Sequence, residues 1–497
     1  MRKKRLAANT ITALILQITT IICGFLLPRL LLSKFGSEVN GLVNSITQFI
    51  SIISFLDLGV GAVFQSSLYK PLADKDNNEI SKVYVSGKKF FNKLGEILVV
   101  YIFLLAIFYP RFVSSSFDFL YVSSLIVIIG ISSFAQYFFG MVNGLLITAD
   151  QRGYIQSVIQ LITIILNTIS CCILIELGAS IHLVKFVTSG FYVLRPIILE
   201  CYVRKNYVIN RSIKLKEEPI KQKWNGLAQH IASVVLESTD SIVLTLFASL
   251  ADVSIYSVYY LVISGLKQLF TAVTNGIQSL IGELYARNQF EELQRVFGWT
   301  EWTIHTVATY IFGCTASLIT PFVLVYTSGI NDTNYNQPVF AIMIVLAYMM
   351  YTYRLPYHIT IKASVQYKQT QRCYACASIL NIILSVVLVW KIGLIGVAIG
   401  TLVAMSYQTI WMALYNSKRI VKCPLKSFFK QIITDLIIFC CGVFCTQGLS
   451  ITKLTYFCWV IMAIKVAMIW LIVVIIINLI MYRSKILYLI KKLNKNH

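Results

Sequence analysis

Charged and aromatic residues recur at helical spacing within long apolar stretches of the sequence. Residues three or four positions apart fall on one face of a helix, so each such group is a candidate binding surface. The two clearest groups are Tyr351, Arg354 and His358 in 338–361, and Tyr256, Tyr260 and Lys267 in 253–277. An arginine offers a phosphate or carboxylate a planar fork of donors, a lysine offers a point charge, and a tyrosine ring offers a stacking face. These residues predict a site that can hold an anion.

Three further ionisable residues are candidates. Arg195 lies well inside 183–203, and Glu237 and Asp240 share a polar face of 227–248, where they can bind a proton or Na⁺. A charge in such apolar surroundings is costly without a partner or a wet cavity. Structural alternatives stay open: Arg195 and Arg354 can each form an ion pair, and Lys267 can pair with Glu237 or Asp240.

Other polar residues predict packing rather than chemistry. Asn, Gln, Ser and Thr stripes in 39–65 and 154–176 favour helix contacts together with a wet cavity. The stretches 95–113, 431–449 and 456–482 have almost no polar stripe, so we expect them to face lipid. Lys185, near the end of its stretch, is expected to extend toward the membrane surface.

The elements that must position these residues are membrane helices. Of the 497 residues, 57% are hydrophobic and 13% are charged, whereas soluble globular proteins are about 25% charged. A bilayer core about 30 Å thick needs roughly 20 helical residues to cross it. We therefore expect an all-α polytopic membrane protein with 14 transmembrane helices, at 10–32, 39–65, 95–113, 119–145, 154–176, 183–203, 227–248, 253–277, 299–326, 338–361, 373–390, 393–415, 431–449 and 456–482.

Positive charge indicates the orientation in the membrane. The chain has 43 Lys and Arg residues against 21 Asp and Glu. Of the 43 cations, 33 lie in the two termini and the loops on their side, and four lie in the opposite loops. Because cytoplasmic loops are rich in Lys and Arg, we predict that both termini are cytoplasmic. The excess of positive charge then needs no nucleic-acid partner.

A weak internal repeat divides the chain. The tract at 151–154 recurs at 371–374 with one substitution, and the turn at 37–39 resembles the one at 251–253. Both offsets pair each helix with the sixth helix after it. We predict an N-terminal six-helix lobe (1–203), a basic cytoplasmic linker (204–226), a parallel six-helix lobe (227–415), and two extra helices with a tail (416–497). Parallel repeats place the transport path between the lobes.

No motif of a soluble enzyme is present in the sequence. There is no phosphate-binding Gly-Lys-Ser/Thr loop, and Cys373 and Cys376 have no second cysteine pair to complete a metal site. The longest loop opposite the termini, 327–337, is too short to carry the chemistry of a membrane polymerase. We therefore expect no enzyme activity and no cofactor.

Four tracts carry a family resemblance: 55–61 (Phe-Leu-Asp-Leu-Gly-Val-Gly), the turn 149–154, and the segments 238–243 and 255–259. Together they resemble the bacterial oligosaccharide flippases, the polysaccharide-transporter branch of the superfamily that also contains multidrug and toxin extrusion transporters and lipid II flippases. The resemblance covers essentially the whole chain. It implies a two-lobed carrier with a cationic central cavity in the bacterial cytoplasmic membrane.

The resemblance also implies an activity. Such a carrier moves undecaprenyl-diphosphate-linked oligosaccharide units from the inner to the outer leaflet by alternating access, for capsule, exopolysaccharide or cell-wall assembly. Its expected partners are the lipid-linked oligosaccharide, membrane lipids, a polysaccharide polymerase and glycosyltransferases. Outward movement of each negative charge gains about 2.3 kcal/mol per 100 mV, so no ATP is needed, and coupling to a proton or Na⁺ stays open. The alternatives are a multidrug/cation antiporter of the same superfamily and a lipid II flippase.

Overall fold

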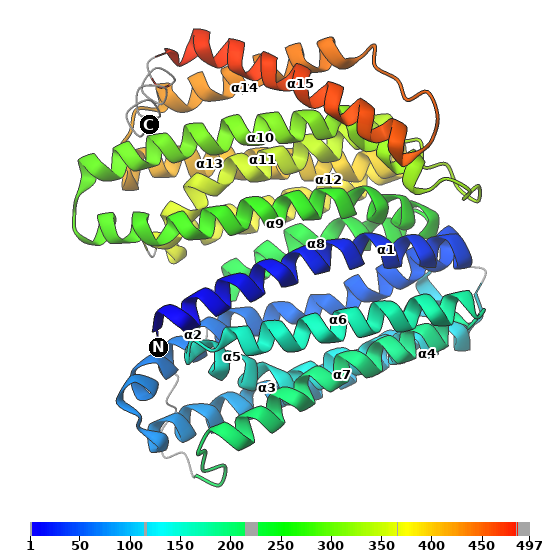
Figure 1. Ribbon diagram of the computed structural model, residues 1–497, viewed down its shortest axis with the longest axis vertical. Helices are drawn as coiled ribbons and strands as arrows, with labels where there is room; N and C mark the ends of the chain where they lie inside the picture. The colour runs from blue at the N-terminus through cyan, green and yellow to red at the C-terminus, as the bar shows by residue number, and fades with distance from the viewer. Residues whose placement is uncertain (1, 114–116, 214–226, 365, 484, 486–497) are drawn as a thin grey trace. The chain divides into compact units, whose positions relative to one another are not determined.

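The computed structural model describes residues 2–113, 117–213, 227–364, 366–483 and 485, and every regular element in these ranges is a helix (Figure 1). The side chains of Asp57, His230 and Glu237 lie outside the described residues. The chain forms two compact units, Met1–Ser254 and Ile255–His497. The all-helical architecture agrees with the sequence, and the predicted division into lobes and linker stays a prediction.

The first unit is a bundle in which α1 packs along α6, α3 packs on α4, and α4 packs on α7. Near its end, α8 joins the bundle through contacts with α1 and α2. The elements of this unit are α1 (Arg2–Ser51), η1 (Ile52–Ser54), α2 (Phe55–Asp74), α3 (Asn77–Phe112), α4 (Phe119–Ala135), η2 (Gln136–Gly140), α5 (Met141–Ala149), α6 (Gly153–Glu176), α7 (Ile181–Asn206) and α8 (Leu227–Phe247).

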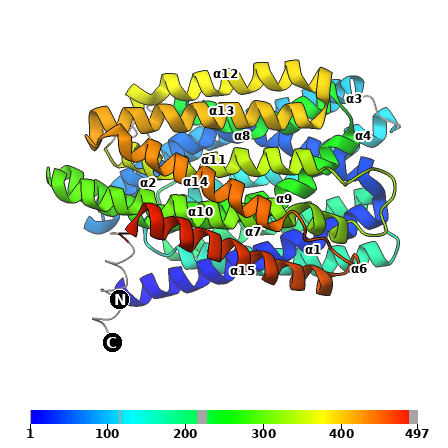
Figure 2. The same ribbon diagram turned by 90° about the horizontal axis from the view of Figure 1, so that it is seen from above.

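The second unit centres on α11, which packs against α10 and α13. Figure 2 shows α12 alongside α13, and the two are in contact along their length. Helices α14 and α15 pack on each other and on α10. The elements are α9 (Leu250–Ala286, whose first residues belong to the first unit), α10 (Phe290–Tyr326), α11 (Pro338–Ala363), α12 (Tyr367–Ile392), α13 (Leu394–Tyr415), η3 (Asn416–Ile420), α14 (Leu425–Thr446) and α15 (Tyr456–Met481).

The expected count of 14 spans is not confirmed. Within the described residues, 12 helices are long and apolar enough to cross a membrane. The first two expected spans lie on the two sides of Gly36, where the backbone of α1 leaves the helical dihedrals, so α1 is two helices that meet at a kink; the φ of Gly36, 80°, lies in the left-handed region that glycine favours. In α8, the apolar stretch within the described residues, Ser238–Phe247, is too short to be counted as a membrane span.

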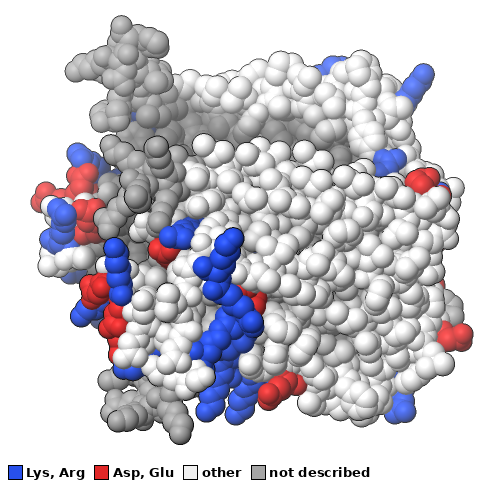
Figure 3. All heavy atoms as spheres, turned by 60° about the horizontal axis from the view of Figure 1, so that its bottom comes forward, with Lys and Arg blue, Asp and Glu red and all other residues white. Residues whose placement is uncertain are grey.

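The outer surface suits a bilayer. On the face shown in Figure 3, Lys, Arg, Asp and Glu lie mostly toward the helix ends, and other residues form the wide surface between them. Large apolar side chains are exposed along the helices, such as Phe103 on α3, Phe444 on α14 and Phe457 on α15. Exposed apolar area of this extent is expected where lipid, rather than water, covers the protein.

The prediction that 431–449 and 456–482 are simply lipid-facing is only half right. Their outer faces are apolar, but α14 buries Gln431, Thr434 and Asp435, and α15 buries Asn478. The polar residues of α14 lie within one helical turn, and Asn478 stands alone on α15. Neither helix therefore shows a long polar stripe in the sequence. Asp435 and Asn478 find partners on α10, in His305 and Trp302. Gln431 and Thr434 donate hydrogen bonds within α14.

Candidate functional site

The predicted faces of α9 and α11 meet around one aromatic ring in the second unit. The guanidinium of Arg354 lies 4.5 Å from the ring centroid of Tyr351, and Nζ of Lys267 lies 5.0 Å from the same centroid. A cation near an aromatic face is attracted by its quadrupole, by about 0.5–2 kcal/mol. Tyr351 therefore holds two positive charges, one from each helix, against its ring.

Arg354 is nearly fully buried, with 3% of its surface exposed. Its Nε has no hydrogen-bond partner, and it forms no ion pair, among the described residues. Burying a guanidinium costs several kcal/mol unless an anion compensates. The structural alternative, an ion pair for Arg354, is therefore not formed within the part of the chain that the structure describes.

A row of tyrosine rings leads to this pair of cations. Tyr256 stacks on Tyr260 with 5.6 Å between centroids, and Tyr260 lies 5.4 Å from Tyr348. Tyr348 in turn lies 6.1 Å from Tyr351. The row runs from two tyrosines of α9 to two of α11, and each two share a helix face because they are four or three residues apart. Tyr348 was missed in the sequence, although it stands three residues before Tyr351 on the same face.

His358 lies one turn after Arg354 on α11, partly exposed, and its ring centroid is 6.2 Å from that of Tyr374 on α12. It extends the same helix face away from the tyrosine row. Five of the predicted residues thus gather around Tyr351 or its row, and His358 adjoins them. Their functional role stays a prediction.

Arg195 belongs to a separate cavity in the first unit. This cavity has a volume of about 390 Å³ and is lined by residues of α1, α4, η2 and α7, including Ser51, Gln136 and Tyr192. An adjoining cavity of about 330 Å³ shares Ser51 and Tyr192 and is lined also by Lys185. The two cavities hold two cations, and no carboxylate is among their lining residues.

Lys185 corrects an expectation from the sequence. It was expected to extend to the membrane surface, but its side chain lines the cavity with Asn167 and Thr188. The polar stripe of α6, predicted to serve packing and a wet cavity, supplies Asn167 to this lining. Lys185 lies ten residues before Arg195, which sets the two side chains about 80° apart around the helix, so the spacing alone did not predict a common cavity.

The acidic candidates are not brought into either cationic site by any described contact. Asp240 on α8 is buried, with 2% of its surface exposed. The side chain of Glu237 lies outside the described residues. The predicted pairing of Lys267 with either of them therefore stays a prediction. No three His, Cys, Asp or Glu side chains gather to hold a metal ion in the described ranges.

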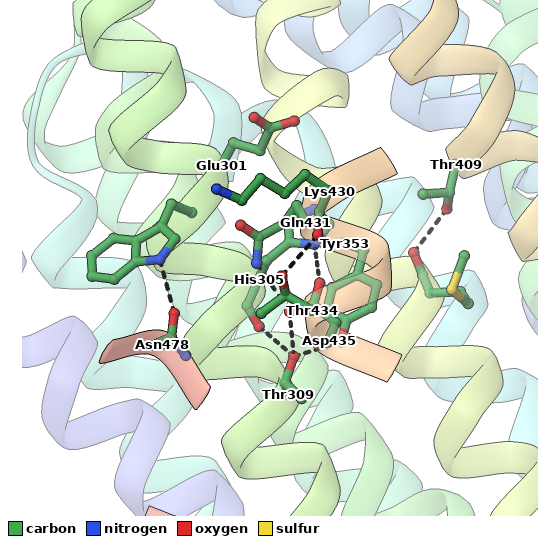
Figure 4. A network of polar contacts seen from close by, with 12 residues as sticks. Glu301, His305, Thr309, Tyr353, Thr409, Lys430, Gln431, Thr434, Asp435 and Asn478 are labelled. Carbon is green, nitrogen blue, oxygen red and sulfur yellow. Dashed lines mark hydrogen bonds and ion pairs between the residues drawn. The ribbon is translucent and has the colours of Figure 1, made fainter. Parts of the chain in front are cut away.

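A second polar cluster in the second unit was missed by the sequence analysis (Figure 4). Nδ1 of His305 on α10 lies 2.7 Å from Oδ2 of Asp435 on α14. Oδ1 of Asp435 accepts hydrogen bonds from Gln431 at 3.0 Å and from Thr309 at 3.1 Å. The ring of Tyr353 on α11 stacks on the imidazole at 4.3 Å. The signals in the sequence were separate ones: polar residues at four-residue spacing around His305 in one apolar stretch, and Gln431 with Asp435 in another.

Comparison with known proteins places the fold among membrane transporters. No protein-family model and no curated protein matches the sequence. A structure of the lipid II flippase MurJ in an inward closed conformation matches with a TM-score of 0.71 at 17% identity, covering 96% of this chain and 99% of that one.

Two multidrug transporters match as well. An inward-facing multidrug resistance MATE family transporter of the MOP superfamily gives a TM-score of 0.63 at 14% identity, covering 81% of this chain and 95% of that one. The MATE multidrug transporter DinF-BH gives 0.61 at 15% identity, covering 86% and 96%. At these identities the likeness shows the fold alone, which this chain shares with the lipid II flippase and the two multidrug transporters.

Proposed function

We propose that this protein is a flippase that moves undecaprenyl-diphosphate-linked oligosaccharides from the inner to the outer leaflet by alternating access. The buried guanidinium of Arg354 carries the proposal, because it has a cation's charge and no anion paired with it among the described residues. A diphosphate would supply that anion through charge-assisted hydrogen bonds. The arrangement with Lys267 at the same ring suits a ligand with more than one negative charge.

The tyrosine row supports a sugar-bearing ligand. Tyr256, Tyr260 and Tyr348 offer ring faces and hydroxyl groups in succession from the cation pair. A sugar ring can pack its apolar face on a tyrosine while its hydroxyls hydrogen-bond to the phenol. In this proposal the diphosphate lies at Arg354 and Lys267, the sugars follow the row, and the lipid tail stays in the bilayer.

The cavity of the first unit supports the same ligand charge. Arg195 lines one of two adjoining cavities and Lys185 the other, and no carboxylate is among their described lining residues. A multidrug antiporter for organic cations would need negative charge in the same place, so the lining favours an anionic substrate over that alternative. A diphosphate would gain free energy on moving outward through an inside-negative membrane.

A lipid II flippase is a second candidate function. The MurJ structure is described as a lipid II flippase, and it aligns with 96% of this chain. Lipid II and an undecaprenyl-linked repeat unit share a polyprenyl diphosphate, so the cationic sites suit either substrate. The two candidates differ only in the sugars and peptide beyond the diphosphate.

Deletion of the gene tests the proposal and separates the candidates. We expect loss of a cell-surface polysaccharide and accumulation of its diphosphate-linked oligosaccharide on the cytoplasmic leaflet. Accumulation of lipid II with arrested wall synthesis would support the second candidate instead. Normal polysaccharide and normal lipid II together with hypersensitivity to cationic drugs would contradict both.

A further inference from the structure

The His305–Asp435 pair lies outside the proposed substrate site and is almost sealed from solvent. The two side chains are 0% and 2% exposed. They join α10 to α14, the first of the two extra helices. A buried pair of ionisable groups in a membrane helix bundle is expensive, so its charge state has consequences for the contact between those helices.

The neighbours of Asp435 favour its ionised form. Oδ1 accepts from the Gln431 amide at 3.0 Å, and Oδ2 faces Nδ1 of His305 at 2.7 Å. The Thr309 hydroxyl lies 3.1 Å from Oδ1 and 2.8 Å from the carbonyl of His305, so its single hydrogen serves one of the two acceptors. An ionised carboxylate can accept from both nitrogen donors, whereas a protonated carboxyl would have to donate one hydrogen itself. The surroundings of Asp435 are therefore those of a carboxylate, with Nδ1 of His305 as a donor.

The other nitrogen of the imidazole then determines the net charge. Nε2 of His305 is buried and has no hydrogen-bond partner among the described residues. Without a proton at Nε2, the pair carries one negative charge inside the unit. With a proton there, imidazolium and carboxylate neutralise each other. A buried carboxylate without a counter-charge costs far more than a hydrogen-bonded ion pair.

The surrounding groups do not supply the missing positive charge. On α10, Glu301 is itself acidic and accepts a hydrogen bond from Tyr357 of α11. On α14, Nζ of Lys430 lies 4.6 Å from the ring centroid of Tyr482. Lys485, beyond α15, donates to the carbonyl of Gly298 at 2.8 Å.

The tyrosines near His305 and Asp435 do not balance the negative charge of the Asp435 carboxylate either. Tyr353 stacks on the imidazole and bonds to Thr309 through its hydroxyl. Tyr357 turns its edge to the same imidazole with 6.4 Å between centroids. A phenol is neutral at physiological pH, so His305 is the cation available to Asp435 in this part of the described structure.

We propose that Nε2 of His305 is a proton-binding site inside the second unit, and that its bound proton holds α14, and with it α15, against α10. The proton is taken from water and returned to water, so only an N–H bond forms or breaks. When the proton leaves, the His305–Asp435 pair carries one negative charge, and the contact between α14 and α10 weakens. This site is distinct from the predicted coupling residues Glu237 and Asp240, and the proposal does not depend on the substrate.

A small cavity lies near the pair. Glu301 and Tyr357 line a cavity of about 10 Å³, close to the volume that one water molecule needs. The hydroxyl of Tyr357 donates to Glu301, and its ring contacts that of His305. A water in the cavity can therefore deliver a proton to groups that adjoin the imidazole.

The test is ¹⁵N NMR of the full-length protein in nanodiscs with labelled histidine. The chain has only five histidines, so His305→Gln identifies the signal of His305 by its loss. We expect both ring nitrogens of His305 to carry a proton at neutral pH. Asp435→Asn removes the counter-charge, and the signal should convert to that of a singly protonated ring.

Tyr353→Phe is the matched control, because it keeps the stacked ring and removes only a hydroxyl. It should leave the imidazolium signal of His305 in place. A singly protonated His305 in the wild type at neutral and mildly acidic pH would overturn the proposal, as would an imidazolium that persists in Asp435→Asn. The wild-type spectrum decides the case if that variant does not fold.

Discussion

At the scale of residues, the chemistry of this protein depends on which side chain faces each arginine. Arg204 and Arg211 lie 2.9 and 2.5 Å from Glu200, and their charges are balanced there. Arg354 has an aromatic ring in place of a carboxylate. A ring holds a guanidinium in position without neutralising it, so the positive charge remains available to a ligand.

Replacement of Arg354 tests this difference. Arg354→Ala should reduce polysaccharide export to the level of a deletion strain while the protein still inserts and folds, because the charge that binds the diphosphate is lost. Arg354→Lys should restore only part of the export, since a lysine keeps the charge but not the bidentate fork. Export in cells and folded yield on size-exclusion chromatography are the two measurements.

Lys465→Ala is the control for that experiment, because Lys465 is an exposed cation on α15 and outside the site. It should leave export unchanged. If Arg354 is instead paired with Glu237 or Asp240, single neutralisations should lower folded yield, and neutralising both partners should restore yield and export together. That rescue would make Arg354 structural and contradict its assignment to the site.

Helical spacing was sufficient to predict which residues share a face, and it brought Tyr256, Tyr260 and Lys267 to the same side of α9. It could not predict which helix would face them, because contacts between α9 and α11 depend on tertiary packing. His305 and Asp435 were missed for the same reason: 130 positions separate them, and the polar residues one turn away on each helix, Thr309 and Gln431, do not show that the two helices meet.

At the scale of elements, the extra helices α14 and α15 are fastened to α10 by packing as well as by polar contacts. The ring of Trp470 on α15 is fully buried between Gly313 of α10 and Gly442 of α14. A Cβ added at Gly313 would lie 2.1 Å from that ring, and one at Gly442 would lie 2.5 Å from it. Nε1 of Trp470 also donates to Ser317 at 3.2 Å.

Gly313→Ala should therefore destabilise the protein by about 1–3 kcal/mol, because the large ring must move to admit the methyl group. Gly298→Ala on the same helix is the matched control, since no atom lies within 4 Å of the added Cβ. That variant should be neutral or more stable by about 0.5–1 kcal/mol. Thermal unfolding in detergent measures both, and equal stability of the two variants would contradict the packing argument.

The presence of helices could be predicted from the length of the apolar stretches, since most of the expected stretches correspond to a helix. The residues at which one helix ends and the next begins were harder to predict. The first two expected spans follow each other without a loop, because a single residue with non-helical dihedrals, Gly36, separates the two helices of α1. The inner polar face of α14 was hidden because Gln431 and Asp435 lie at the start of an apolar stretch.

At the scale of the whole molecule, orientation in the membrane is a prediction from charge. The two termini and the loops on their side hold 33 of the 43 Lys and Arg residues, which favours a cytoplasmic location for them. A cysteine at Asn331, in the exposed connection between α10 and α11, should react with an impermeant thiol reagent from outside the cell. A cysteine at Lys216, which lies outside the described residues, should not.

The chain has 12 native cysteines, so labelling of each variant is compared with labelling of the unsubstituted protein. Reaction at position 216 and protection at position 331 would reverse the orientation. The six-helix repeat stays a prediction. The boundary between the two compact units falls at 254/255, inside α9, and the sequence similarity between the halves is weak. Fold class was predictable from composition, whereas the grouping of helices into units depends on packing.

The central claim is that this protein carries a polyprenyl-diphosphate oligosaccharide across a bilayer, and reconstitution tests it most directly. Purified protein is placed in liposomes that hold a labelled undecaprenyl-diphosphate oligosaccharide in the inner leaflet, and its arrival outside is followed with an impermeant sugar-modifying reagent. We predict rapid exposure of the sugar with the wild type and exposure at the protein-free rate with Arg354→Ala. Wild-type liposomes that expose the sugar no faster than protein-free ones, yet transport a lipophilic organic cation, would contradict the account.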